Sequence, residues 1–279
     1  MVLLKEDKGF DLVGKYDQDS INGFDPQLID QMLKLLEPEK AQSVLDAMAG
    51  DGNLSQRLYE YCLTHQIRCP KLFVLEYSQV QTEFARHKLA PANAEVILGD
   101  VLTMTSRDSQ IPIPDNSFDR VMIKSSNHEI PRSHQLELYQ SIYRVLKPGG
   151  IFINLGMLFD DPQERDELRE IARVKDTYAG MDDLAKNRHF LTRQEFYGWL
   201  TNAGFISIQS KQTLNYRINS SIVAQQYFSE DQRLQADLEH QAAQVKAYKM
   251  RLNGRIQFDR DVSLMLCPGE ITTARKPSV

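Results

Sequence analysis

A glycine-containing loop directly follows the first short apolar run of the chain. The loop reads Asp46-Ala-Met-Ala-Gly-Asp-Gly52 and leads into a helical pattern. Gly50 and Gly52 let the backbone pass close to a ligand because no side chain intervenes. Asp46 stands at the carboxyl end of the apolar run, where open α/β sheets bind their ligands. Such a loop alone is also compatible with a simple tight turn, so its meaning depends on the other strand ends.

Carboxylates also end the next two apolar runs. Glu76 closes the run that starts at Leu72 and is followed by Tyr77, and Asp100 closes the run that starts at Val96. A carboxylate at the second position can accept hydrogen bonds from both hydroxyls of a ribose. One at the third position could accept from the amino group of an adenine. Together with the loop, these two acids predict a binding site for a nucleoside-containing ligand.

The segment after the fourth apolar run contains His128 and Glu129. A neutral histidine can take a proton from a hydroxyl or an amine because its pKa lies near neutral pH. The same residues are compatible with a loop that only shapes the start of the next helix at Arg132. His128 and Glu129 are therefore candidate catalytic residues, with a purely structural role as the alternative.

Short runs that are apolar on both faces alternate with helical patterns and predict a parallel sheet covered by helices on each side. These runs are Val44–Leu45, Leu72–Leu75, Val96–Leu98, Val121–Ile123 and Ile151–Ile153. The helices between them imply right-handed βαβ units in a doubly wound sheet. Asp25-Pro26 predicts a helix start before the sheet, and Thr192-Arg-Gln-Glu195 predicts a capping box. Two more strands are expected, at about 205–210 and within 262–275.

The order and spacing of these motifs resemble those of class I S-adenosylmethionine-dependent methyltransferases, in particular the ubiquinone/menaquinone-biosynthesis type and related small-molecule enzymes. The resemblance covers about residues 40–155 and the two-strand ending. It implies a Rossmann-like α/β fold with a doubly wound, mostly parallel seven-stranded sheet, an antiparallel last strand and a helical cap insertion. This chain departs from the family at Met48, which stands where the loop usually has its first glycine.

The resemblance also implies the contacts of the cofactor, S-adenosylmethionine. The loop after the first strand would hold the methionine end, the acid after the second strand the ribose, and the acid after the third strand the adenine edge, with Tyr77 flanking the adenine. The predicted cofactor-binding residues are Asp46, Ala47, Met48, Ala49, Gly50, Asp51, Gly52, Glu76, Tyr77, Asp100, Val101, Lys124 and Ser125. For Asp51, capping of the next helix is an equally open role.

The domain prediction assigns residues 1–25 to an N-terminal arm or lid and 26–279 to the methyltransferase domain. Helical insertions are expected at about 157–190 and 216–256. Tyr16 in the arm and Tyr178, Arg188 and His189 in the first insertion are candidate acceptor contacts, although packed or solvated roles are alternatives. Aromatic residues of the second insertion could line an apolar acceptor pocket; they are Tyr216, Tyr227, Phe228, Tyr248 and Phe258. The alternative for this insertion is a helix that packs outside the sheet or pairs two subunits, so a homodimer remains open.

The composition narrows the classes of partner. Lys and Arg number 33 against 38 Asp and Glu, which argues against a broad nucleic-acid-binding surface. No apolar stretch approaches the roughly 20 residues of a membrane-spanning helix, and the first apolar run is too short for a signal peptide. Cys62, Cys69 and Cys267 form no ligand or disulfide pattern. We therefore expect a cytoplasmic protein with no metal, no membrane contact and a small-molecule substrate.

The expected activity is transfer of a methyl group from S-adenosylmethionine to a small organic acceptor, with an oxygen or nitrogen atom favoured as the nucleophile. A methyltransferase-like module that binds without catalysis is one alternative. A nucleotide-dependent oxidoreductase is the other. It is disfavoured because Met48 interrupts the G-x-G-x-x-G spacing of dinucleotide-binding loops.

Overall fold

The computed structural model describes residues 10–11, 22, 24, 26–230, 233–250, 256–259 and 262–278 of the chain. Tyr16 and most of the predicted arm lie outside these residues.

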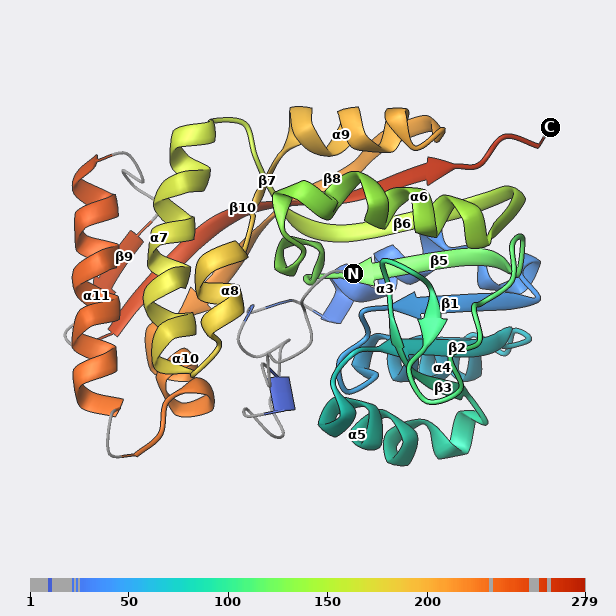
Figure 1. Ribbon diagram of the computed structural model, residues 1–279, viewed down its shortest axis with the longest axis horizontal. Helices are drawn as coiled ribbons and strands as arrows, with labels where there is room; N and C mark the ends of the chain where they lie inside the picture. Colours follow the sequence, from blue (N-terminus) through green and yellow to red (C-terminus); the bar gives the residue numbers. More distant parts are fainter. Residues whose placement is uncertain are drawn as a thin grey trace.

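One sheet runs through the described part of the molecule (Figure 1). In spatial order its strands are β4 (Thr105–Ser106), β3 (Glu95–Asp100), β2 (Lys71–Glu76), β1 (Ser43–Ala47), β5 (Phe118–Lys124), β6 (Leu146–Phe159), β10 (Val262–Arg275) and β8 (Ile206–Asn219). The strands from β3 to β6 are parallel, whereas β10 is antiparallel to both of its neighbours, β6 and β8. The predicted mostly parallel sheet with an antiparallel last strand is confirmed, and seven of its ten described strands are at least five residues long. The remaining strands β4, β7 (Leu191–Thr192) and β9 (Ile256–Asp259) are only two to four residues long.

Strand β1 lies at the point where the strand order reverses. From β1 the chain builds outward to β2 and β3, and it then returns to the other side of β1 with β5. Asp46 of β1 is in register with Val74 of β2 and Met122 of β5. The loop after β1 therefore opens at the switch point of the sheet, which is where doubly wound folds bind ligands.

Helices cover both faces of the sheet, as predicted. One face carries α3 (Pro26–Leu35), α4 (Asn53–Thr64) and α5 (Gln79–Leu89), and the other carries α6 (Gln135–Val145) and α9 (Arg193–Asn202). Short 3₁₀ turns connect them at η1 (Pro38–Lys40), η2 (Ala90–Ala92), η3 (Asn127–Glu129) and η4 (Arg132–His134). Helix α3 begins at Pro26, as the sequence predicts. At α9 the predicted capping box is present, because Thr192 and Glu195 each accept a hydrogen bond of 3.2 Å from the other's backbone N–H.

Four helices from two distant parts of the chain gather at one end of the sheet, on the left of Figure 1. They are α7 (Pro162–Tyr178), α8 (Asp182–Asn187), α10 (Ser220–Tyr227) and α11 (Arg233–Met250). Leu168 and Ile171 of α7 pack with Met265 of β10, and Val223 of α10 packs with Ala236 of α11. We call these four helices the cap.

Strand β8 is longer than the predicted strand at 205–210. It continues to Asn219 because its second half pairs with the first half of β10, from Leu214 opposite Gly269 to Asn219 opposite Leu264. Tyr216 therefore belongs to the sheet and its side chain is fully buried. The helical part of the second insertion begins only at Ser220.

Candidate cofactor and acceptor site

The loop after β1 has the left-handed backbone that its glycines predict. The φ angles of Met48, Gly50 and Gly52 are 59°, 57° and 80°. A Cβ atom at Gly52 would also lie 2.9 Å from Leu89 Cδ1 of α5, so glycine is required there for packing. Met48 adopts the left-handed conformation at a cost of about 1–2 kcal/mol, and its side chain packs against the main core. Met48 thus has a positive φ angle, which glycine adopts without this cost.

The three predicted acids stand at the ends of the adjacent strands β1, β2 and β3. Asp46 accepts a hydrogen bond of 2.8 Å from Ser55 Oγ, and its carboxylate is almost completely buried. Glu76 accepts from the backbone N–H groups of Gly50 and Ser78, both at 2.8 Å, and so ties the loop after β1 to the end of β2. Asp100 accepts from the Leu102 N–H at 2.8 Å.

Burial raises the pKa of each of these three carboxyl groups. It raises the pKa of Asp46 to about 7, although the hydrogen bond from Ser55 and the charge of Lys124 act in the opposite direction. Burial is also the main cause of the raised pKa values of Glu76 and Asp100. Buried acids with raised pKa values are stabilised as carboxylates by a cationic or strongly hydrogen-bonding ligand. This edge of the sheet is therefore suited to a ligand that brings N–H and O–H donors or positive charge.

Tyr77 and Asp51 both have protein partners. The Arg107 guanidinium lies 4.3 Å from the centre of the Tyr77 ring and donates a hydrogen bond of 2.6 Å to the Tyr77 carbonyl oxygen. Asp51 forms an ion pair with Lys88 and accepts a hydrogen bond of 3.3 Å from the Asn53 N–H in the first turn of α4. The capping role that the sequence leaves open for Asp51 thus has a contact that supports it.

Two described residues of the predicted arm lie beside the acid of β2. The Asp11 carboxylate accepts hydrogen bonds from Ser78 Oγ and, at 3.1 Å, from the Val80 N–H. The Phe10 carbonyl oxygen accepts from Gln81 Nε2 at 3.2 Å. These contacts place Phe10 and Asp11 over the first turn of α5.

Lys124 and Ser125 connect the strand ends to a pocket. Both side chains are buried at the end of β5. The Lys124 ammonium lies 5.9 Å from the Phe24 ring, and Ser125 Oγ lies 2.9 Å from the Tyr216 hydroxyl in a hydrogen bond. Ser125 also lines the pocket beneath the cap, so the predicted cofactor edge and the pocket share this residue.

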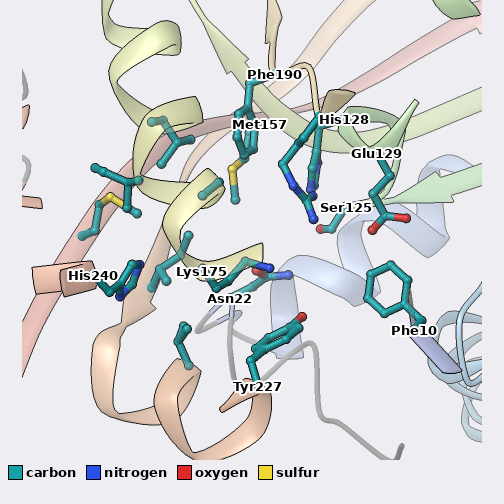
Figure 2. A pocket seen from close by; sticks show the side chains of 17 residues that line it. Phe10, Asn22, Ser125, His128, Glu129, Met157, Lys175, Phe190, Tyr227 and His240 are labelled. Carbon is teal, nitrogen blue, oxygen red and sulfur yellow. The ribbon is translucent and has the colours of Figure 1, made fainter. Parts of the chain in front are cut away.

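The pocket beneath the cap, together with its open mouth, spans about 690 Å³ of space not filled by protein atoms. Its polar lining comes from the sheet edge, the arm and the cap. These polar residues are Asn22, Ser125, His128, Glu129, Lys175, Arg188, Tyr227 and His240. Figure 2 shows His128 and Glu129 on the side of Ser125, with Lys175 and Tyr227 reaching in from the cap.

The predicted catalytic residues both line this pocket. The His128 ring stacks on Phe190 with the ring centres 4.9 Å apart. Burial, reinforced by the charges of Arg188 and Lys175, holds the pKa of His128 well below its ordinary value. His128 Nδ1 has no hydrogen-bond partner within the described residues. Burial raises the pKa of Glu129 to about 8, so this carboxyl group is largely protonated at neutral pH.

The cap contains a buried charge cluster, of which only Arg188 was a predicted acceptor contact; Lys175 and Asp176 were not predicted. Asp176 has a completely buried side chain and pairs with two cations. Its Oδ1 atom lies 2.6 Å from Lys175 Nζ, and its two oxygens accept from Arg188 Nε at 2.7 Å and Nη2 at 3.1 Å. The sequence shows these residues within highly charged helical segments, which are typical of solvated helix faces. Only the packing of α7 against its neighbours turns them inward.

The predicted acceptor contacts Tyr178 and His189 are not among the described residues that line the pocket. The Tyr178 ring packs against Phe228 with the ring centres 6.1 Å apart, and its hydroxyl group forms a hydrogen bond with Glu239 of α11. His189 lies behind the pocket, where its backbone N–H donates to the His128 carbonyl oxygen at 2.9 Å. Its Nε2 atom is 3.5 Å from Glu195.

Among the aromatic residues predicted for the acceptor pocket, only Tyr227 is found in the described lining. Phe228 packs inside the cap with Val223 and Ala224. Tyr216 is buried in the sheet and contacts Phe24 edge to face at 4.8 Å. The side chains of Tyr248 and Phe258 lie outside the described part of the chain.

Comparison with known proteins finds similarity to methyltransferases. Residues 44–150 match the family model described as a methyltransferase domain. YqeM of Bacillus subtilis (strain 168), a methyltransferase by name, is 28% identical over 169 residues, which are 56% of this chain and 62% of YqeM. A demethylmenaquinone methyltransferase of Listeria monocytogenes (serotype 4a) is 30% identical over 125 residues, which are 43% of this chain and 46% of the relative. The solved structure of YcgJ from Bacillus subtilis has a TM-score of 0.69 at 17% identity and covers 90% of this chain and 98% of YcgJ.

Residues 44–150 thus match a methyltransferase domain, and the chain shares the fold of YcgJ. These matches agree with the methyltransferase class that the sequence motifs indicate. The chain spans less than two thirds of the length of the two curated relatives above. None of the described helices has the length and apolarity needed to cross a membrane.

Proposed function

We propose that this protein transfers a methyl group from S-adenosylmethionine to a small organic acceptor held in the pocket beneath the cap. The observation that carries the proposal is the continuity of the two parts of the site. Asp46, Glu76 and Asp100 end adjacent strands on one side of the switch point. Strand β5 lies on the other side of the switch point, and Ser125 and Glu129, which follow it in the chain, line the pocket.

The chemistry of the three acids suits this cofactor. S-adenosylmethionine offers two ribose hydroxyls, an ammonium group, an adenine amino group and a sulfonium charge. Glu76 would accept from the ribose hydroxyls, Asp46 would face the methionine end, and Asp100 with Val101 would lie at the adenine edge. Because burial raises the pKa of all three acids, a ligand with donors and positive charge would bind here with a gain in electrostatic energy.

When bound, the cofactor would supply a methyl group attached to a positively charged sulfur. The nucleophilic atom of the acceptor would bond to the methyl carbon in one step, and the sulfur would leave as the neutral thioether of S-adenosylhomocysteine. The protein has to bring the nucleophile into line with the methyl carbon and sulfur, and such alignment can supply much of the rate acceleration. The buried walls of the pocket exclude water from the acceptor. Ser125, His128 and Glu129 would form the part of the wall nearest the transferred methyl group.

Glu129 is the better candidate for the residue that takes a proton from the acceptor. A general base is most effective when its pKa lies near the working pH. The pKa of Glu129 is raised to about 8, whereas that of His128 is driven well below its ordinary value and leaves a weakly basic imidazole. We therefore assign proton removal to Glu129 and orientation of the acceptor to His128.

This assignment predicts the pH dependence of the reaction. Glu129 acts as a base only when ionised, so kcat/KM is expected to rise about tenfold per pH unit up to about pH 8 and then to level off. Glu129→Gln should lower the rate by about 100-fold and abolish this rise. Steady-state rates between pH 6 and 9.5 measure both effects.

His128→Ala is the matched variant for this experiment, because it changes the neighbouring residue in η3. It should lower the rate but keep the rise toward pH 8. A rise that persists in Glu129→Gln and is lost in His128→Ala would reverse the two assignments.

We propose a cytoplasmic enzyme of small-molecule metabolism that methylates oxygen or nitrogen and does not act on nucleic acid. The formal net charge of −5 and the free thiols of Cys62, Cys69 and Cys267 support this setting. A homodimer through the cap remains a further proposal.

Calorimetric titration with S-adenosylmethionine and S-adenosylhomocysteine tests the proposed function, with NADH as the control. We expect both sulfur compounds to bind in the micromolar range and NADH not to bind. Absence of binding by both would refute the proposal. Binding of both, without methylation of any acceptor in a mass-spectrometric screen, would instead support a non-catalytic binding module.

A further inference from the structure

Cationic side chains outnumber the acids that pair with them in the pocket beneath the cap. Lys175 and Arg188 both line it, and within the described residues Asp176 is the only acid in ion-pair contact with either. The side chains of Lys175, Arg188 and Asp176 are 15%, 6% and 0% exposed, so water screens them poorly. Two cations share one carboxylate, which leaves an excess of one positive charge. Burial lowers the pKa of Lys175, and the charge of Asp176 opposes this shift.

The other titratable groups of the pocket do not neutralise this charge. Burial lowers the pKa of His240 to about 4 and that of His128 well below its ordinary value, so both imidazoles are neutral. Burial raises the pKa of Glu129 to about 8, although the charges of Arg188 and Lys175 act in the opposite direction, so the protonated form of Glu129 predominates at pH 7. A buried charge without a counter-charge costs several kcal/mol, and a bound anion would remove that cost.

The orientation of the two cations makes Lys175 the more available one. Arg188 is held by two hydrogen bonds to Asp176 in a fork arrangement, which is the tightest geometry for this pair. The Lys175 ammonium has a single contact with Asp176 and lies 4.2 Å from the centre of the Tyr227 ring. In Figure 2 the Lys175 side chain extends from α7 toward the middle of the pocket, on the side opposite Glu129.

The rest of the lining is apolar. It includes Met157, Leu168, Ile171, Phe190, Val223 and Met265. Such walls favour a hydrocarbon or aromatic body and offer few hydrogen-bonding groups to a sugar or a peptide.

We propose that the methyl acceptor carries a single negative charge, such as a carboxylate, on an apolar body, and that Lys175 binds this charge together with the Arg188–Asp176 pair. The inference rests on the proposed function and names the class of its substrate. The anionic end would lie at the cap, and the nucleophilic atom would lie at the opposite end, near Ser125 and Glu129.

Paired acids and amides of the same shape test this inference on protein saturated with S-adenosylhomocysteine. The probes are hexanoate, benzoate, 4-hydroxybenzoate and indole-3-acetate, each beside its amide, and calorimetry gives the dissociation constants. The acids should bind at least tenfold more tightly than their amides. Lys175→Met should remove this preference, because it deletes the excess positive charge and leaves the Arg188–Asp176 pair intact.

Two variants control this experiment. Lys186→Met deletes an exposed lysine of α8 in the same cap and should leave the preference for acids unchanged. Lys175→Arg restores the charge and should restore the preference at least in part. Binding of S-adenosylhomocysteine should be equal in all four proteins, which shows that each variant is folded.

The outcomes separate the inference from the proposed function. If S-adenosylhomocysteine does not bind, the proposed function itself fails. If it binds but acids and amides behave alike across the panel, including no binding of either, an anionic acceptor is ruled out. A preference for acids that survives in Lys175→Met would assign the anion to another residue and also overturn the inference.

Discussion

Replacing Glu76 with alanine is expected to weaken the binding of S-adenosylmethionine by about 100-fold. In the proposed complex the carboxylate accepts two hydrogen bonds from the ribose. Each hydrogen bond to a charged group contributes at least about 1.5 kcal/mol, and 1.4 kcal/mol corresponds to a factor of ten in affinity. Calorimetric titration with S-adenosylhomocysteine measures the loss without turnover.

The structure adds a second reason for a large effect. Glu76 also accepts the Gly50 N–H, so it holds the loop that would contact the methionine end. Glu76→Gln keeps an oxygen acceptor and should lose less affinity than Glu76→Ala. Glu95→Ala is the matched control, because Glu95 is an exposed acid at the start of β3 and forms a surface ion pair with Lys71. An affinity of Glu76→Ala within threefold of the wild type would contradict the assignment of this acid to the ribose.

The second large effect concerns stability. Asp176→Asn should lower the free energy of unfolding by about 3–5 kcal/mol, because it leaves the Lys175 and Arg188 charges buried without a counter-charge. Urea unfolding at pH 7, followed by circular dichroism, measures this change. Loss of structure in the cap would accompany it, since Asp176 joins α7 to the segment after α8.

Helix α7 provides its own control for this prediction. Glu170 and Arg173 form an ion pair three residues apart on the exposed face, where both side chains are about half exposed. Glu170→Gln should change the free energy of unfolding by less than about 1 kcal/mol, because exposed pairs contribute little. Equal effects of the two substitutions would mean that the Asp176 cluster is solvated in solution.

Both predictions begin from carboxylates whose surroundings differ. Glu76 is held by backbone N–H groups at the edge of the sheet, where the ribose would bind in the proposed complex. Asp176 is held by side chains inside the cap, which fold over it. The first acid should therefore affect binding more than stability, and the second should affect stability first.

The sequence by itself determined the class of fold and the grouping of three acids at one edge of the sheet. Apolar runs such as Leu72–Leu75 and Val121–Ile123 form strands covered on both faces, and a strand of this kind leaves little choice but a parallel sheet between helices. In such a sheet the strand ends meet at one edge, so Asp46, Glu76 and Asp100 could be grouped from their positions alone. Local signals were equally sufficient for the starts of α3 and α9, because a cap depends on only a few neighbouring residues.

The tertiary structure alone decided which side chains line the pocket beneath the cap. Lys175 and Arg188 are separated by α8 in the chain, and nothing in their spacing indicates that they share Asp176. Tyr178 and His189 were expected at the acceptor, yet they pack beside and behind the pocket. Side chains of cap helices can face water, the core or a pocket, and the packing of α7, α10 and α11 selects among these orientations. A parallel sheet positions its strand ends by backbone geometry, whereas a helical cap positions its side chains only through long-range contacts.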